Sequence, residues 1–480
     1  MTDLIGPLLA DHPFTAALVP TTGSDLRVVA VTDSGLGNTS WLVDLGHREA
    51  LVVDPERDPS PYRAVAERLG TTITLAADTH LHADFVTGSP ELAAAGADVV
   101  AARAGEVQWP HHGVTPGDAV DLGTWRLQVL ATPGHTPEHV AYVLADADRP
   151  RAVFSGGSLL VGAVARTDLI DPADTDALTR ALWHSVRHEL MGLPDDVAVF
   201  PTHGAGSFCS AAGDHRRWTT IGQERRTNPL LAAPDEDTFV RWVLDQLGTY
   251  PPYFLRLRAV NRLGPRVFGA FPTLPPLDPG RVEDLRAQGA VVVDVRPVTE
   301  FAAGHVAGSL VITLRPQFSS WLGWMVPDPA TPLVFVTDQH TDRAELVRQC
   351  LNIGYEHLAG ELSGGLAGWA AAGGALGSVA HLDAAHLAAA GSSGRTVIDV
   401  RQVAEYDDGH VPGAVHVELG SLSERASNLP ATPLIMMCGH GERAATGASV
   451  LAATGRTDVA VFEGGPAAWA AVSGVPLVRS

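Results

Sequence analysis

Two groups of residues with reactive side chains stand out: histidines in the first half of the sequence and a cysteine near its end. The motif DTHLHAD contains His80, His82 and Asp84 directly after a short apolar run. Because side chains alternate along a strand, both imidazoles are expected to leave the strand end on the same side. Imidazole is the commonest protein ligand for zinc and related metals, and a neighbouring carboxylate orients or shares such a metal. Since His135 and His203 close two further strand-like runs, the sequence predicts a metal centre.

The cysteine, Cys438, opens the loop CGHGER between an apolar run and a predicted helix. Converging backbone N–H groups and the helix dipole stabilise a thiolate in such a position. Two glycines let the loop curl so that its amides point inward, and Arg443 adds a fixed positive charge. The same cradle stabilises a persulfide, so the loop predicts a sulfur-transfer nucleophile, in preference to a buried structural cysteine. The predicted catalytic residues are Cys438 and Arg443, and the cradle residues are Gly439, His440, Gly441 and Glu442.

The elements that must position the histidines are short. Residues 26–160 alternate β-rich runs with turn clusters, interrupted by a helical pattern over 60–69 and an alanine-rich segment over 90–97. An amphipathic helix is expected over 176–190, and a strand over 197–200 leads to His203. This mixture of strands and helices is typical of an α/β sandwich.

An internal repeat surrounds the cysteine. The motif VVVDVR at 291–296 returns as TVIDVR at 396–401, and GHVAG at 304–308 returns as GHVPG at 409–413. Each copy alternates strand and helix patterns over roughly a hundred residues, as doubly wound parallel sheets do. The first copy has Asp338 where the second has its cysteine, and a carboxylate cannot carry a sulfane sulfur. We expect Asp338 to sit in the amide nest as a permanent anion.

Composition narrows the function further. The formal charge of −21 argues against a nucleic-acid partner, and the absence of lysine excludes Schiff-base chemistry. Three cysteines are too few for a disulfide framework and suit a reducing compartment. The N-terminal residues lack a basic segment, and no apolar run approaches the length of a membrane span. We therefore expect a cytoplasmic protein without a membrane partner, and a homo-oligomer.

The order and spacing of the histidine motifs resemble the metallo-β-lactamase superfamily. THLHADF followed by TGS is most similar to its branch of persulfide dioxygenases and sulfurtransferase fusions. The DVR, GHxxG and GG-x-x-x-W series resembles rhodanese domains, and six residues from cysteine to arginine match the loop of rhodanese sulfurtransferases. The resemblance implies an N-terminal metallo-β-lactamase-like αββα sandwich followed by two rhodanese-like doubly wound parallel-sheet domains. The expected boundaries are 1–255 for the sandwich with a helical extension, 256–277 for a linker, 278–376 for the rhodanese-like domain without the cysteine, and 377–480 for the rhodanese domain with Cys438.

The resemblance also implies ligands for one iron, namely His80, His135 and an aspartate at a position where this chain has Gly157. Phe85 replaces a histidine that a second metal needs. We expect His82 to complete a three-histidine site with His80 and His135, and Asp84 and His203 are further candidate ligands. Neutral ligands hold iron more weakly than an aspartate does, so the expected iron is substoichiometric, with zinc as the alternative.

Arg166 lies in an RTD stretch that the family associates with the thiol substrate, whereas the alternative role is a structural ion pair. The resemblance implies oxidation of a low-molecular-weight thiol persulfide to sulfite at a mononuclear iron, coupled to sulfur transfer through a Cys438 persulfide, with sulfite or thiosulfate as further sulfur compounds. Two alternatives stay open. One is a thioester hydrolase of the glyoxalase II kind, and the other is a rhodanese sulfurtransferase whose first domain is a catalytically inactive scaffold.

Overall fold

The computed structural model describes residues 14–19, 26–210, 215–390 and 394–480. Internal contacts divide the chain into two compact units. The first is Met1–Phe271 with Arg348–Gly354, and the second is Pro272–Val347 with Tyr355–Ser480. Within the described ranges, every helix is too short or too polar to cross a bilayer.

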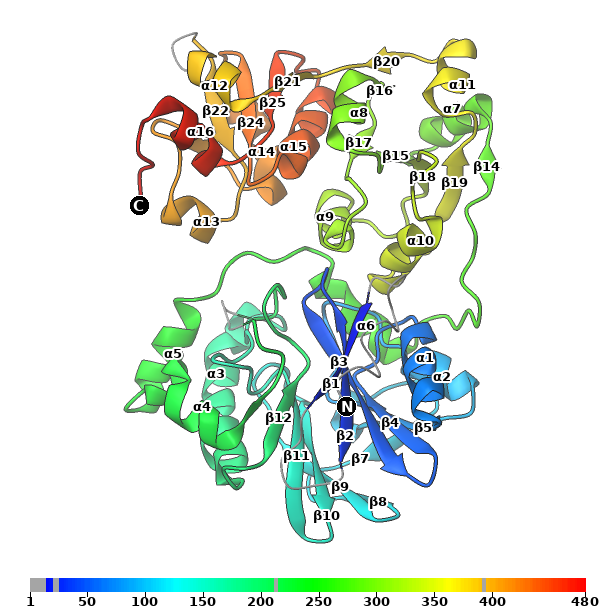
Figure 1. The fold of residues 1–480 in the computed structure, drawn as a ribbon, viewed down its shortest axis with the longest axis vertical. Helices are drawn as coiled ribbons and strands as arrows, with labels where there is room; N and C mark the ends of the chain where they lie inside the picture. Colours follow the sequence, from blue (N-terminus) through cyan, green and yellow to red (C-terminus); the bar gives the residue numbers. More distant parts are fainter. Residues whose placement is uncertain (1–13, 20–25, 211–214, 391–393) are drawn as a thin grey trace. The chain divides into compact units, whose positions relative to one another are not determined.

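The first unit contains two sheets whose strands run in sequence order (Figure 1). The seven-stranded sheet consists of β1 (Phe14–Val19), β2 (Arg27–Asp33), β3 (Asn38–Gly46), β4 (Glu49–Val53), β5 (Thr72–Asp78), β6 (Asp98–Ala102) and β7 (His112–Val114). The six-stranded sheet has the order β13 (Thr219–Thr220), β12 (Ala198–Pro201), β11 (Arg149–Gly156), β10 (Val140–Asp146), β9 (Trp125–Ala131) and β8 (Ala119–Leu122).

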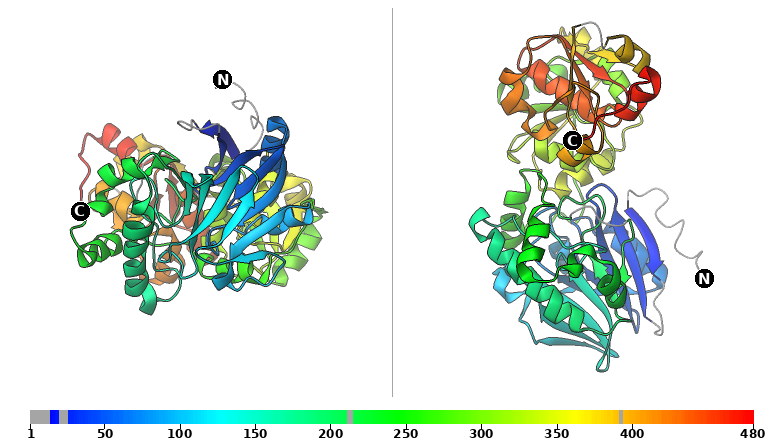
Figure 2. Two further views of the ribbon diagram at one scale, coloured as in Figure 1. Left: turned by 90° about the horizontal axis from the view of Figure 1, so that it is seen from below. Right: turned by 90° about the vertical axis from the view of Figure 1, so that its left-hand side faces the viewer.

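The main core of this unit lies between the two sheets. Trp41 and Val53 from one sheet pack in the same buried cluster as Tyr142, Phe154 and Phe200 from the other. Because side chains alternate along each strand, the opposite faces of both sheets carry apolar residues as well, and these pack against helices. The result is the predicted αββα sandwich, visible from two further directions in Figure 2.

Helices cover both outer faces of the sandwich. One face packs against α1 (Ser60–Leu69) and α2 (Ser89–Ala94), and the other packs against α3 (Thr175–His184), α4 (Ile221–Thr227) and α5 (Glu236–Leu244). A further helix, α6 (Phe254–Leu263), contacts the loop after β5 through Asn261. The helix expected over 176–190 ends as α3 at His184 and continues as a π-helical turn, Ser185–Glu189. The segment expected to be a linker, 256–277, begins inside α6, and the first unit runs on to Phe271.

The second unit contains two five-stranded sheets, and within each sheet the strands run parallel. The first consists of β14 (Pro276–Leu277), β19 (Leu358–Leu362), β18 (Leu333–Val336), β15 (Val291–Asp294) and β17 (Leu310–Val311). The second consists of β21 (Ala380–Leu382), β25 (Val459–Phe462), β24 (Leu434–Met437), β22 (Thr396–Asp399) and β23 (Val415–His416). A short antiparallel pair, β16 (His305–Val306) with β20 (Leu376–Gly377), lies outside them. Thus the predicted fold class is confirmed for both halves of the chain.

The helices of the second unit surround these sheets. Those of the first copy are α7 (Pro279–Ala287), α8 (Val298–Ala303), α9 (Phe318–Met325), α10 (Arg343–Asn352) and α11 (Gly365–Ala371), and α10 belongs to the first unit from Arg348 onward. Those of the second copy are α12 (Ala384–Ala390), α13 (Val403–Asp408), α14 (Leu422–Arg425), α15 (Glu442–Ala453) and α16 (Pro466–Ser473).

The repeated motifs are structural. Arg296 pairs with Asp294 at 2.6 Å and donates to the Gly304 carbonyl at 2.9 Å. Arg401 makes the same two contacts in the second copy, with Asp399 at 2.7 Å and the Gly409 carbonyl at 2.9 Å. In each copy the arginine of DVR therefore ties the end of a central strand to the start of the GHxxG turn.

Candidate functional site

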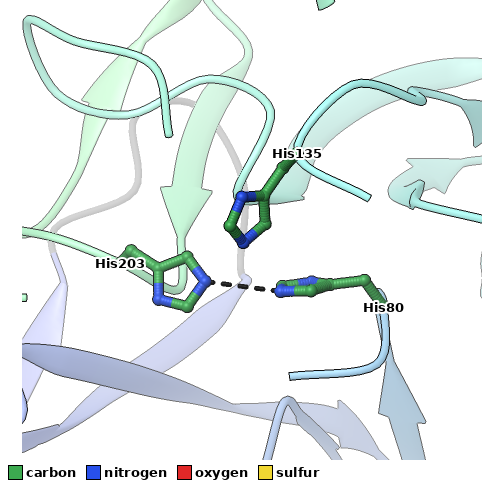
Figure 3. A group of neighbouring side chains, drawn as sticks. All are labelled: His80, His135 and His203. Atoms are coloured by element: carbon green, nitrogen blue, oxygen red, sulfur yellow. Dashed lines mark hydrogen bonds between the residues drawn. The ribbon is translucent and has the colours of Figure 1, made fainter. Parts of the chain in front are cut away.

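The histidine motifs meet where strands of both sheets end. His80 follows β5, His135 follows β9 and His203 follows β12, and all three are buried. One ring nitrogen of each lies within 4.8 Å of the other two. Figure 3 shows the three rings pointing toward one another, with Nε2 of His80 and Nε2 of His203 only 3.4 Å apart.

Hydrogen bonds on the far side of two rings fix their tautomers. Thr79 donates its hydroxyl proton to Asp54 (2.8 Å), so its oxygen is an acceptor for Nδ1–H of His80 (2.8 Å). Nδ1–H of His135 donates to the Arg166 carbonyl (2.6 Å). In both rings the Nε2 lone pair is consequently left facing the centre of the cluster, as in metal-binding histidines whose other nitrogen is anchored.

His203 is oriented in the same way. Its Nδ1 lies 3.0 Å from Asn38 Oδ1 and 3.2 Å from Asp84 Oδ2. Because Asn38 uses its amide nitrogen to donate to Asp84 (2.9 Å), both of these oxygens act as acceptors and the proton is on Nδ1 of the histidine. A third Nε2 lone pair therefore faces the centre. Three converging lone pairs repel one another without a cation between them.

Burial keeps the imidazoles of His80 and His135 neutral. It lowers the pKa of His80 well below the ordinary value and lowers the pKa of His135 to about 3. Nε2 of His135 is buried and has no hydrogen-bond partner among the described residues, a costly state for a polar atom. Neutral imidazoles with unpaired nitrogens are what a divalent metal binds, so the residues present fit a metal ion.

His82 occupies a different place from the one expected. Its Nε2 lies 3.1 Å from Asp54, and its ring stacks on Phe85 with centroids 4.2 Å apart. His82 lies close enough to share a metal ion with Asp54 and His80, or with Asp84 and His203. No such group contains both His82 and His135 among the described residues. The set that converges with His80 and His135 contains His203 instead.

Several residues at the centre escaped the sequence analysis. Asp54 is buried and accepts hydrogen bonds from Thr79 N–H (2.7 Å) and from the Thr202 hydroxyl. In the sequence, only its position at the end of an apolar run could have indicated a role at the site. His139 stacks on His80 with centroids 4.8 Å apart, and its four-residue spacing from His135 could have drawn attention to it.

In the cysteine loop of the second unit, one backbone amide points at the sulfur. Cys438 directly follows β24 and is buried, and Gly441 N–H donates to its sulfur at 3.1 Å. Gly441 has a φ of 98°, a conformation that glycine adopts without strain, and the twelve-residue helix α15 begins at the next residue. Arg443 lies beside the sulfur but pairs with both carboxylate oxygens of Glu405, at 2.6 and 2.7 Å.

Several known proteins resemble parts of this chain. Human persulfide dioxygenase ETHE1 is 32% identical over 42% of this chain and 73% of its own length. The hydroxyacylglutathione hydrolase of Rhodobacter capsulatus is 36% identical over 33% of this chain and 68% of its own length. A crystal structure of a metallo-β-lactamase from Staphylococcus aureus matches 70% of this chain and 99% of its own, with 27% identity and a TM-score of 0.62. Residues 278–372 and 383–472 each match the rhodanese-like domain.

These matches decide the family. The chain belongs to the persulfide dioxygenases of the metallo-β-lactamase fold. It joins this first half to two rhodanese-like domains, and the combination supports a role as an enzyme of sulfur metabolism. The relatives together with the histidine and aspartate cluster imply a bound metal.

Arg166, expected at the thiol substrate, is almost completely engaged by the protein. Its guanidinium pairs with Asp168 (2.7 Å), donates to the carbonyls of Phe208 and Gly248, and lies over the Tyr250 ring. Its carbonyl accepts from the metal-site imidazole described above. The geometry matches the structural alternative, and a role in substrate binding stays a prediction.

The cysteine-less copy holds an anion in the corresponding nest. Asp338 accepts hydrogen bonds from the backbone N–H groups of His340 and Thr341, both at 2.7 Å, and from the Thr341 hydroxyl at 2.9 Å. Although partial burial opposes it, these hydrogen bonds lower the pKa of Asp338 below its ordinary value. This confirms the expectation of a fixed carboxylate in place of the thiolate.

Proposed function

We propose that the chain oxidises a low-molecular-weight thiol persulfide to sulfite with one iron per chain, and that it transfers sulfane sulfur through a persulfide on Cys438. The observation that carries the proposal is the convergence of Nε2 of His80, His135 and His203 on one point. The identity to persulfide dioxygenase ETHE1 over this half supports the choice of substrate and metal.

In this proposal the three histidines hold the metal, and the Nδ1 hydrogen bonds keep the rings oriented for it. Iron bound there would supply activation of dioxygen and an attachment point for the substrate sulfur. One persulfide, one dioxygen and one water give the free thiol, sulfite and two protons. The buried surroundings of the site keep bulk water from the reacting atoms.

The second reaction needs only the cysteine loop. The Cys438 thiolate attacks the outer sulfur of a persulfide, a new sulfur–sulfur bond forms, and the thiol of the donor leaves. A nucleophilic acceptor such as cyanide or a second thiol can then attack the outer sulfur on Cys438, which carries that sulfur away and regenerates the thiolate. Electrons balance in both steps without an external oxidant.

Elemental analysis and an oxygen electrode test the first reaction. Purified protein should contain up to about one iron per chain and consume oxygen when a thiol persulfide is added. His80→Ala and His135→Ala should lose both properties. His112→Ala is the matched control, because that side chain is 71% exposed and lies outside the cluster.

The same measurements separate the alternatives. Two zinc ions per chain with hydrolysis of an acylglutathione thioester would favour the hydrolase reading, which the similarity to hydroxyacylglutathione hydrolases raises. Protein that binds no metal and consumes no oxygen would leave the first unit as a scaffold. For the second reaction, Cys438→Ser should abolish sulfur transfer to cyanide, whereas Cys350→Ser and Cys209→Ser should retain it; transfer surviving in Cys438→Ser would overturn the assignment.

A further inference from the structure

The cavity beside Cys438 is lined by both rhodanese copies. The cysteine-less copy contributes the residues after β17 and from α9, and the second copy contributes the loop and the start of α15. The lining residues are Ile312, Thr313, Arg315 and Trp321 from the first copy and Cys438, His440, Glu442, Arg443 and Thr446 from the second.

Direct hydrogen bonds hold the two sides of this cavity together. The Thr446 hydroxyl on α15 donates to the Val311 carbonyl at 2.8 Å, and Val311 N–H donates to the Ser449 hydroxyl at 3.2 Å. Helix α15 thus runs beside the edge strand β17 of the other copy (Figure 1). The cysteine-less copy is a fixed wall of the sulfur-transfer site.

The positive charges that line this cavity are compensated by carboxylates. Arg315 forms a close ion pair with Glu442 in the cysteine loop, and its Nε donates to Gln317 at 3.1 Å. Arg443 is paired with Glu405, and its guanidinium also lies 5.5 Å from the Trp321 ring centroid. Two guanidinium groups therefore face two carboxylates, and Glu442 itself lines the cavity.

This arrangement distinguishes between sulfur donors. A dianion such as thiosulfate is attracted by cations that can give it charge-assisted hydrogen bonds, but here both guanidinium groups already bind carboxylates. A carboxylate in the cavity wall also repels a second anion. The sulfane end of an organic persulfide carries less charge, and it meets the apolar surfaces of Trp321 and Ile312.

We propose that Glu442, through its ion pair with Arg315 of the cysteine-less copy, is a specificity-determining residue that favours organic persulfides over inorganic dianions as sulfur donors to Cys438. The inference rests on the proposed sulfur transfer and names the substrate class of that site. In the favoured step the thiolate takes the outer sulfur and the donor leaves as a thiolate. The cysteine-less copy then has a function in selecting the donor.

The test compares kcat/KM for glutathione persulfide and for thiosulfate in the full chain, with cyanide as the acceptor. Glu442→Gln frees Arg315, and kcat/KM for thiosulfate should rise about tenfold relative to kcat/KM for the persulfide. Arg315→Gln leaves Glu442 uncompensated, so the same ratio should fall about tenfold. Glu283→Gln is the control, because this carboxylate pairs with Arg286 on the exposed face of α7 and lies outside the cavity.

The ratio of the two kcat/KM values decides the outcome. Equal changes for both donors, or an unchanged ratio in both variants, would overturn the inference while leaving sulfur transfer intact. A wild-type protein that accepts sulfur from neither donor would instead overturn the proposed function. Since the side chains of Glu442 and Arg315 are 30% and 35% exposed, melting curves of the variants should match the wild type, and either variant alone can show the change in ratio.

Discussion

Gly157 lies so close to the imidazole of His135 that a β-carbon at position 157 would stand 2.4 Å from Cδ2 and 2.8 Å from Cγ of the ring. The ring occupies space that any larger side chain at this position needs. It is also anchored, because its Nδ1 donates to the Arg166 carbonyl at 2.6 Å. The position where the family resemblance implies an aspartate is therefore filled by a metal-site histidine in this chain.

Substitution at Gly157 should separate the effect of added charge from the effect of added volume. Gly157→Asp forces the His135 ring to shift but adds a negative ligand, so iron content and persulfide-dependent oxygen uptake should both rise. Gly157→Ala adds only the β-carbon, so iron content should fall below that of the wild type. Elemental analysis of both variants checks this, and a gain of iron in the alanine variant would contradict the explanation.

The third histidine ligand can be identified by metal content alone. His203→Ala removes one of the three converging nitrogens, so bound metal should drop to near zero. His82→Ala removes a ring that contacts Asp54 and not His135, so a large part of the metal should remain. The reverse order of metal loss would assign the site to His80, His82 and His135, the set expected from the sequence.

The charge pair beside the cysteine should control the reactivity of Cys438. Arg443→Ala removes a cation near the sulfur and should slow alkylation by iodoacetamide at neutral pH by up to about tenfold. Glu405→Gln leaves that cation uncompensated and should accelerate alkylation by a similar factor. Alkylation rates that stay the same in both variants would show that the backbone amides suffice.

Asp338 should make a small, pH-dependent contribution to stability. Its pKa in the folded state is below the unfolded value of about 3.9, so the stabilisation is present above that value and is lost as pH falls through the folded pKa. Asp338→Asn retains an acceptor oxygen but removes the charge. The variant should melt slightly below the wild type at pH 7, and the difference should shrink as the pH falls below about 3.9; a difference that does not change with pH would refute the electrostatic explanation.

The architecture could be predicted from short sequence patterns because the contacts that account for each pattern within the repeat join residues that are close in sequence. The DVR and GHxxG motifs recur since Arg296 and Arg401 each bridge two segments that lie eight residues apart along the chain. The hydrogen bond from Gly441 N–H to the Cys438 sulfur also lies within one short sequence motif, whereas the cradling roles of the other loop residues stay predictions. In contrast, the sequence analysis ended the first unit at residue 255, whereas the structure extends it to Phe271. Helix α6 belongs to this unit through contacts with residues far away in the sequence, which local patterns do not reveal.

The metal centre was only partly predictable for the same reason. The alternation argument for His82 applies to a strand, but β5 ends at Asp78 and the two histidines lie in an irregular loop. Asn38 and Asp54 belong to the site through contacts with residues far away in the sequence, which no local spacing reveals.

Asn261 on α6 shows what these distant contacts mean for work with shortened proteins. Its side-chain amide donates to the carbonyls of His82 (2.8 Å) and Phe85 (2.9 Å), and its oxygen accepts from Thr87 N–H (2.9 Å). A gene truncated at residue 255, where the sequence suggested a domain end, would encode a histidine loop stripped of these three bonds. A stop codon just beyond Phe271 keeps these three bonds but still removes Arg348–Gly354, the part of the first unit in which the Asn352 carbonyl accepts from Val86 N–H at 2.7 Å, so a shortened protein can present a damaged loop as an inactive enzyme.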